Sequence, residues 1–182
     1  KFIKIKTNNR LLDAEVVGNL SVKLNMGQPI FEWDKIPLAK KLDNNSIDLT
    51  IDNKSIKNGF CLNVGNPHIV FFVKNCFEYD LRNIGPKIEN HSIFPERTNV
   101  TFAQIENKKL IKINVWERGA GLTKACGTAA CATAVAALKS ELTSNKVEIK
   151  FNEGVLDIEI DESDNIFMTG PVSEIKNVEI DI

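Results

Sequence analysis

Long hydrophobic runs and closely spaced cysteine pairs are both missing from this sequence. No apolar stretch is long enough to span a bilayer, and the first residues do not resemble a signal peptide, so we expect a cytoplasmic protein without a membrane partner. The 4 cysteines among 182 residues are too few for a disulfide framework. They also lack the Cys-x-x-Cys spacing of a zinc site, so reduced thiols and no bound metal are expected.

An excess of either charge is missing as well. The 23 basic and 24 acidic residues are well mixed and give a net charge of −1, so there is no reason to expect a nucleic-acid partner. A hydrophobic content of 43% is ordinary for a globular protein, and 182 residues suffice for one good-sized domain or two small ones. The composition therefore permits an enzyme without selecting one.

Strand patterns dominate the chain. Alternating apolar and polar residues, or runs of β-branched residues, are typical of strands. Turn-forming pairs such as Asn8-Asn9, Gly18-Asn19 and Asn107-Lys108 favour hairpins between them. The expected strands cover residues 2–6, 11–17, 21–25, 46–52, 60–64, 69–73, 100–106, 110–116, 147–151, 155–160 and 165–169.

Two helices are expected, a short one near residues 80–89 and a longer one over residues 127–142. The longer helix is apolar on nearly every face in its first ten or so residues, where Thr133 is the only hydroxyl after residue 128. A helix of this kind is usually buried on all sides. The pattern therefore predicts an α/β (α+β) fold in which a sheet wraps around a central helix.

Cys126 stands at the predicted start of the longer helix, after a strand and two glycines. The first amides of a helix lack intrahelical partners and carry partial positive charge, which favours a thiolate and can bring its pKa toward neutrality. The amides of Gly127, Thr128 and Ala129 would also suit a substrate carboxylate or phosphate. The alternative is that Cys126 is a small buried apolar residue and the glycines only form a turn.

Two polar turns precede this segment. Asn66 offers a hydrogen-bond donor and an acceptor, and His68 can donate to a carboxylate or titrate near neutrality. Further on, Glu96, Arg97 and Asn99 crowd together just before a strand. Each turn alone is common in loops, so neither one identifies a site.

The order and spacing of four motifs, however, resemble the C-terminal part of diaminopimelate epimerase, a pyridoxal-independent amino-acid epimerase. The match extends along nearly the whole chain. The four motifs are Gly65-Asn-Pro-His68, Phe94-Pro-Glu-Arg-Thr-Asn99, Glu117-Arg-Gly-Ala-Gly121 and Ala125-Cys-Gly-Thr-Ala-Ala-Cys131.

The resemblance implies a mixed, mostly antiparallel sheet around a central buried helix, and it implies a reaction without a cofactor. In that reaction one cysteine thiolate removes the α-proton of LL- or meso-diaminopimelate and a second cysteine thiol reprotonates the opposite face. Cys126 matches the second cysteine, and His68 matches a residue beside the site. The implied substrate-binding residues are Asn66, Asn99, Glu117, Arg118, Gly127 and Thr128. The family also implies a homodimer and a role in making lysine and peptidoglycan precursors.

The sequence departs from the family in lacking the motif of its first cysteine, since neither Cys61 nor Cys76 has that context. We therefore expect a C-terminal portion of a longer enzyme that is inactive by itself. Residues 25–173 would form the C-terminal domain, while residues 1–24 and 174–182 would contribute strands to the other domain. Such strands would have free edges, through which the chain can self-associate. A smaller departure is Ala129, where relatives tend to have glycine.

Four other interpretations stay open. Proline racemase-like enzymes share the fold and the two-thiol reaction, and phenazine-biosynthesis-type isomerases share the fold without needing the cysteine pair. A non-catalytic module that binds a carboxylate at Cys126 and the helix end belongs to a different class. A thiol redox sensor is the weakest of the four, because Cys126 and Cys131 are five apart on a helix and face different sides.

Overall fold

The structure is a computed structural model that describes residues 1–7 and 11–173. The expected turn at Asn8-Asn9 and the strands assigned to residues 174–182 lie outside the described residues. The elements are β1 (Phe2–Lys6), β2 (Leu11–Gly18), β3 (Ser21–Gly27), β4 (Ile47–Ile51), β5 (Lys54–Asn63), β6 (Pro67–Phe72), α1 (Leu81–Glu89), β7 (Asn99–Asn107), β8 (Leu110–Glu117), β9 (Gly121–Leu122), α2 (Gly127–Lys139), β10 (Lys146–Phe151), β11 (Gly154–Ile160) and β12 (Ile166–Pro171).

The strands form one continuous sheet in the order β1-β2-β3-β12-β11-β10-β8-β7-β6-β5-β4, with β9 paired to β8. Neighbours are antiparallel except for the parallel pairs β6–β7 and β8–β10. Each expected strand is present; β1 has the predicted ends, the other strands have shifted ends, and β9 is the addition. The largest shift is at β5, which begins at Lys54 because Asp52 and Asn53, with φ of 51° and 62°, form a tight hairpin turn after β4.

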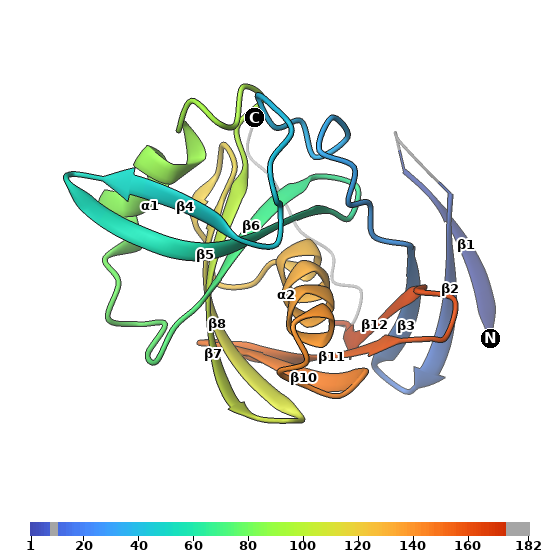
Figure 1. Cartoon of the computed structure of the whole chain (residues 1–182). Helices are drawn as coiled ribbons and strands as arrows, with labels where there is room; N and C mark the ends of the chain where they lie inside the picture. Colours follow the sequence, from blue (N-terminus) through green and yellow to red (C-terminus); the bar gives the residue numbers. More distant parts are fainter. Residues whose placement is uncertain (8–10, 174–182) are drawn as a thin grey trace, which may run out of the picture.

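Helix α2 lies at the centre of the curved sheet (Figure 1). Every residue from Ala129 to Ala137 is buried, as the apolar pattern predicts. The helix packs with inward-facing residues of the surrounding strands, among them Leu62, Val70 and Ile149. The predicted helix end at residue 142 is wrong by three residues, since Ser140 caps the helix and Glu141 adopts a φ of 59° that breaks it.

Helix α1 lies on the other side of the sheet, over a second core that includes Phe71, Phe102 and Ile88. Its first turn is capped by Asp80, whose carboxylate accepts a hydrogen bond of 3.2 Å from the amide of Arg82. The buried Gly85 lets the helix approach the end of β8 closely. A β-carbon at Gly85 would lie only 2.5 Å from Cδ2 of the Trp116 indole.

Substituting alanine for Gly85 is therefore expected to destabilise the protein. Overpacking against a rigid ring costs about 1–3 kcal/mol, which exceeds the gain of about 1 kcal/mol that alanine brings to a helix interior. Urea unfolding should show a lower free energy of unfolding for Gly85→Ala. The matched control is Gly154→Ala, where an added β-carbon meets nothing within 4 Å and stability should stay within about 0.5 kcal/mol. Equal stability of both variants would contradict the prediction.

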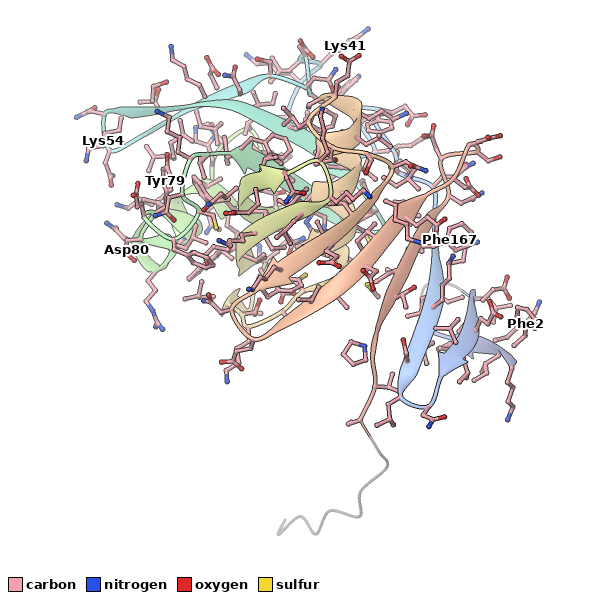
Figure 2. All side chains as sticks on the ribbon, turned by 90° about the horizontal axis from the view of Figure 1, so that it is seen from below. Phe2, Lys41, Lys54, Tyr79, Asp80 and Phe167 are labelled. Atoms are coloured by element: carbon pink, nitrogen blue, oxygen red, sulfur yellow. The ribbon has the colours of Figure 1, made fainter. Side chains whose placement is uncertain are left out.

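Strands β1, β2 and β3 extend the sheet to one side, away from α1 and β4 (Figure 1). They join the rest through the pairing of β3 with β12, and Lys23 of β3 reaches Glu159 of β11 at 3.0 Å. Strand β1 is an edge strand of the sheet formed by the described residues, and Phe2 at its end is 82% exposed, on the opposite side of the view from Tyr79 (Figure 2). The division into a domain of residues 25–173 and strands of another domain stays a prediction, as does self-association through this edge. Within the described residues, no helix is long and apolar enough to cross a membrane.

Candidate active site

The predicted site residues converge at one end of the sheet. Strands β6 and β7 run parallel and in register, with His68 beside Asn99 near their starts. Strand β8 runs antiparallel to β7, so it ends at Glu117 on the same edge. Helix α2 also begins there, because Asn66 just before β6 contacts Thr128 in the first turn of the helix. The topology thus gathers motifs that are up to about 60 residues apart in the chain.

Cys126 is the N-cap residue of α2, as the sequence predicts, and it is buried with 7% of its surface exposed. The expectation of a lowered thiol pKa is wrong in this structure. Burial raises the pKa of Cys126, and the charge of Glu117 together with its hydrogen bond to the thiol raises it further. The hydroxyl of Thr128 and the amide of Ala129 lower the pKa but do not outweigh the burial. Cys126 therefore rests as a thiol.

A chain of hydrogen bonds connects His68 to this thiol. Burial, and to a lesser degree the charge of Arg118, lowers the pKa of His68 to about 3, so the ring is neutral at physiological pH. Its Nε2 lies 2.9 Å from Oδ1 of Asn66, which can only accept, so Nε2 carries the proton. This fixes the Asn66 amide, whose Nδ2 donates to Oγ1 of Thr128 over 3.3 Å. Thr128 Oγ1 in turn lies 3.5 Å from Sγ of Cys126.

The order of donors in this chain favours a thiolate whenever Cys126 loses its proton. Thr128 accepts from Asn66, so its own hydroxyl proton is available to the sulfur. Thr128→Val keeps the shape and removes the donor. At a fixed pH near 8 we expect iodoacetamide to alkylate Cys126 about 2- to 10-fold more slowly in the variant, because the pKa of the thiol rises further. An unchanged rate would show that the hydroxyl contributes nothing to the thiolate.

Asn99 and Arg118 lie near His68. The side chain of Asn99 is buried and spans two backbone groups, donating to the carbonyl of Pro67 over 2.7 Å and accepting from the amide of Arg118 over 2.9 Å. The guanidinium of Arg118 donates to the carbonyl of Glu96 over 3.0 Å. Its charge is close enough to His68 to lower the pKa of the ring. The structure thus places a cation near His68, with Asn99 holding its backbone.

The first turn of α2 adds further donors. Helix hydrogen bonding begins with the amide of Ala130, which donates to the carbonyl of Cys126 over 3.1 Å. The amides of Gly127 and Thr128 therefore have no carbonyl one turn back to receive them. A β-carbon at Gly127 would lie 2.9 Å from Sδ of Met168, so the glycine lets β12 approach the helix start. An anion at this end of the helix would meet partial positive charge and free amides.

All eight predicted site residues therefore lie together at this edge of the sheet. Cys61 and Cys76 lie elsewhere, and burial raises the pKa of both thiols, that of Cys76 to about 11, which makes them unreactive. Glu89 and Trp116 contact each other and, through Glu89, the turn that follows Glu117, and neither residue is predicted from the sequence. The spacing of four between Gly85 and Glu89 places both on one face of α1, but it does not reveal that the carboxylate is buried.

Most of the chain matches known proteins. The family model described as diaminopimelate epimerase matches residues 60–175. A diaminopimelate epimerase of Pelagibacter ubique is 51% identical over 183 aligned positions, which cover 99% of this chain and 67% of that protein. One from the Wolbachia of Brugia malayi is 44% identical and covers 91% of this chain and 62% of that protein.

The chain belongs to the diaminopimelate epimerase family. It spans roughly two thirds of the length of the curated relatives that it matches. Solved structures share the fold at low sequence identity. A probable proline racemase from Agrobacterium radiobacter has a TM-score of 0.70 and 12% identity, over 100% of this chain and 61% of that one. A phenazine biosynthesis protein of Bacillus anthracis has a TM-score of 0.59 and 12% identity, over 98% and 69%.

Proposed function

We propose that the intact protein containing this chain interconverts LL- and meso-diaminopimelate without a cofactor, and that Cys126 is one of its two acid–base groups. The observation that carries the proposal is the position of Cys126 at the start of α2, against Glu117 and Thr128. Membership of the family supports the same substrate. The cysteine, the helix end that would bind an anion and a nearby arginine are among the groups that such a reaction requires.

The reaction exchanges one proton for another and changes no oxidation state. A base on one face takes the proton from the α-carbon, and the Cys126 thiol on the other face gives its proton to the same carbon. The C–H bond that forms has the opposite configuration to the one that breaks. In the reverse direction the Cys126 thiolate is the base. A resting thiol with a raised pKa suits the first role, and the hydroxyl of Thr128 suits the second.

The planar intermediate carries negative charge that spreads into the α-carboxylate. The amides of Gly127 and Thr128, with the partial charge of the helix end, would hold that carboxylate. Arg118 would add a full positive charge at the same edge of the sheet. The carboxylate of Glu117 and the amide of Asn66 would then face the α-amino group. Asn99 would bind the substrate directly, and it also holds the backbone of Arg118 in place.

The second acid–base group is the part that the described residues do not supply. Of the other cysteines that they contain, Cys61 and Cys76 are buried with raised pKa values, and Cys131 is fully buried inside α2. A two-thiol reaction therefore needs a second cysteine from outside the described residues. About a third of the length of the relatives lies outside the part that this chain matches, and that third of the protein would supply it. We propose that this chain alone does not epimerise.

The test is an exchange assay on the protein encoded by the whole reading frame, with this chain as a parallel sample. LL-diaminopimelate in deuterated water is followed by proton NMR for loss of the α-proton signal and appearance of the meso isomer. We expect both with the intact protein and neither with the chain alone. L-Proline and trans-4-hydroxy-L-proline serve as competing substrates.

Each outcome decides between the candidate functions. Exchange of L-proline instead of diaminopimelate would reassign the protein to a proline racemase-like reaction. Exchange of neither, with saturable binding of diaminopimelate by calorimetry, would favour the non-catalytic carboxylate-binding module. Turnover by this chain alone would overturn the requirement for a second group outside the described residues.

A further inference from the structure

Glu89, the last residue of α1, is a buried carboxylate close to the candidate site, and the proposed reaction does not use it. It is 5% exposed. Its Oε2 accepts from Nε1 of Trp116 over 2.7 Å, and its Oε1 accepts from the amide of Gly119 over 2.9 Å. The guanidinium of Arg97 adds a longer contact of 3.4 Å to Oε1. Removing a carboxylate from water is costly unless donors surround it, and these three groups supply them.

The partners of Glu89 flank the two charged residues of the site. Trp116 directly precedes Glu117, and Gly119 directly follows Arg118. The amide of Arg118 is itself held by Asn99. Two successive amides of the turn are thus fixed by two buried side chains, one from α1 and one from β7. The turn has little freedom to move relative to the sheet.

The same contacts also connect α1 to the turn. The indole of Trp116 packs on Gly85 and lies 3.4 Å from the position of a β-carbon at Gly121, so it is enclosed by the helix on one side and the turn on the other. Its Nε1 then reaches Glu89 one helical turn beyond Gly85. Arg97, in the loop before β7, has a φ of 60° and contacts Glu89 from that side.

We propose that Glu89 is a positioning residue that holds the Glu117–Arg118 turn beside Cys126. The inference rests on the proposed function, since it assigns Glu89 a role in the same site. Glu89 does not touch the reacting atoms. It acts through the amide of Gly119 and the indole of Trp116, and a displacement of the turn by about 1 Å is enough to cost roughly 100-fold in rate.

The main variant is Glu89→Gln, which keeps the shape and replaces one oxygen by a donating amide group. Trp116 Nε1 or the Gly119 amide then faces another donor, so the turn must shift. In the intact protein we expect kcat/KM for diaminopimelate to fall about 10- to 100-fold, mainly through kcat, with the protein still folded. The matched control is Lys87→Gln on the same helix, which loses an exposed ion pair with Asp52 and should keep full activity.

A second measurement does not depend on turnover. Glu117 raises the pKa of Cys126, so a displaced turn weakens that effect and the thiol becomes more reactive. The pH profile of iodoacetamide alkylation of Cys126 should therefore move to lower pH in Glu89→Gln and stay in place in Lys87→Gln. A role limited to fold stability would lower the melting temperature without moving this profile.

The outcomes separate this inference from the proposed function. If the intact parent shows no exchange of diaminopimelate, the proposed function fails, and the alkylation profile still decides the role of Glu89. If Glu89→Gln has the parent's kcat/KM and the parent's profile, the positioning role is overturned. Should Glu89→Gln fail to fold, Trp116→Phe removes only one donor, and a smaller change of both readouts in the same directions supports the role while no change overturns it.

Discussion

Replacing Cys126 by alanine in the intact protein should abolish the interconversion of LL- and meso-diaminopimelate, with a fall in kcat/KM of about 1,000-fold or more. A positioned acid or base typically contributes about 100- to 10,000-fold, and the proposal assigns the proton transfer at the start of α2 to Cys126. The fold should tolerate the change. The Cys126 side chain makes no capping hydrogen bond, so the start of the helix does not depend on the sulfur.

The matched control is Cys131→Ala, which removes the same atom from the same helix. Cys131 is fully buried in the core around α2, so we expect a loss of stability of about 1 kcal/mol with the interconversion retained. NMR of the reaction in deuterated water, started separately from each isomer, measures both variants. Interconversion by Cys126→Ala at more than a tenth of the parental rate would remove Cys126 from the reaction.

Much of the fold follows from local patterns. Alternation predicts the strands because one face of each lies against a core, and the apolar sequence of α2 predicts a buried helix because the sheet surrounds it. Local patterns do not show which strands pair when the strands are far apart in the chain. Nothing local indicates that β3 pairs with β12, or that β10 lies parallel to β8. The two residues of β9 are too few to show any period.

The site shows the same division. The helix start at Cys126 follows from glycines and a change of period, but the pKa of the thiol depends on burial and on Glu117, which tertiary packing brings to it. The four motifs are recognisable as a set, although Asn99 and Asn66 each look like ordinary loop residues. The burial and partners of Glu89 are not predictable from the sequence. The partners are a backbone amide and an indole, whose positions depend on how α1 packs against β8.

Lowering the pH from 7.5 to 5 should destabilise the protein by about 2 kcal/mol through His68 alone. The ring is fully buried, and burial lowers its pKa from 6.5 to about 3. Between these values the unfolded chain binds a proton that the folded chain does not. The free energy of unfolding therefore falls as the pH falls below about 6.5, by roughly 1.4 kcal/mol per pH unit, and the full loss is reached only near pH 3.

Urea unfolding between pH 5 and 7.5 measures the slope of the unfolding free energy against pH. Carboxyl groups usually titrate below this range, so they contribute little to the slope. His68→Gln should remove most of the slope, because a neutral amide can still donate to Asn66 and does not titrate. The control is His91→Gln, which changes the chain's other histidine, a partly exposed residue after α1, and should keep the slope. The slopes decide the question, since His68→Gln also changes stability at pH 7.5 by altering packing. A slope that persists in His68→Gln would place the acid-sensitive group elsewhere and would mean that His68 holds its proton inside the folded protein.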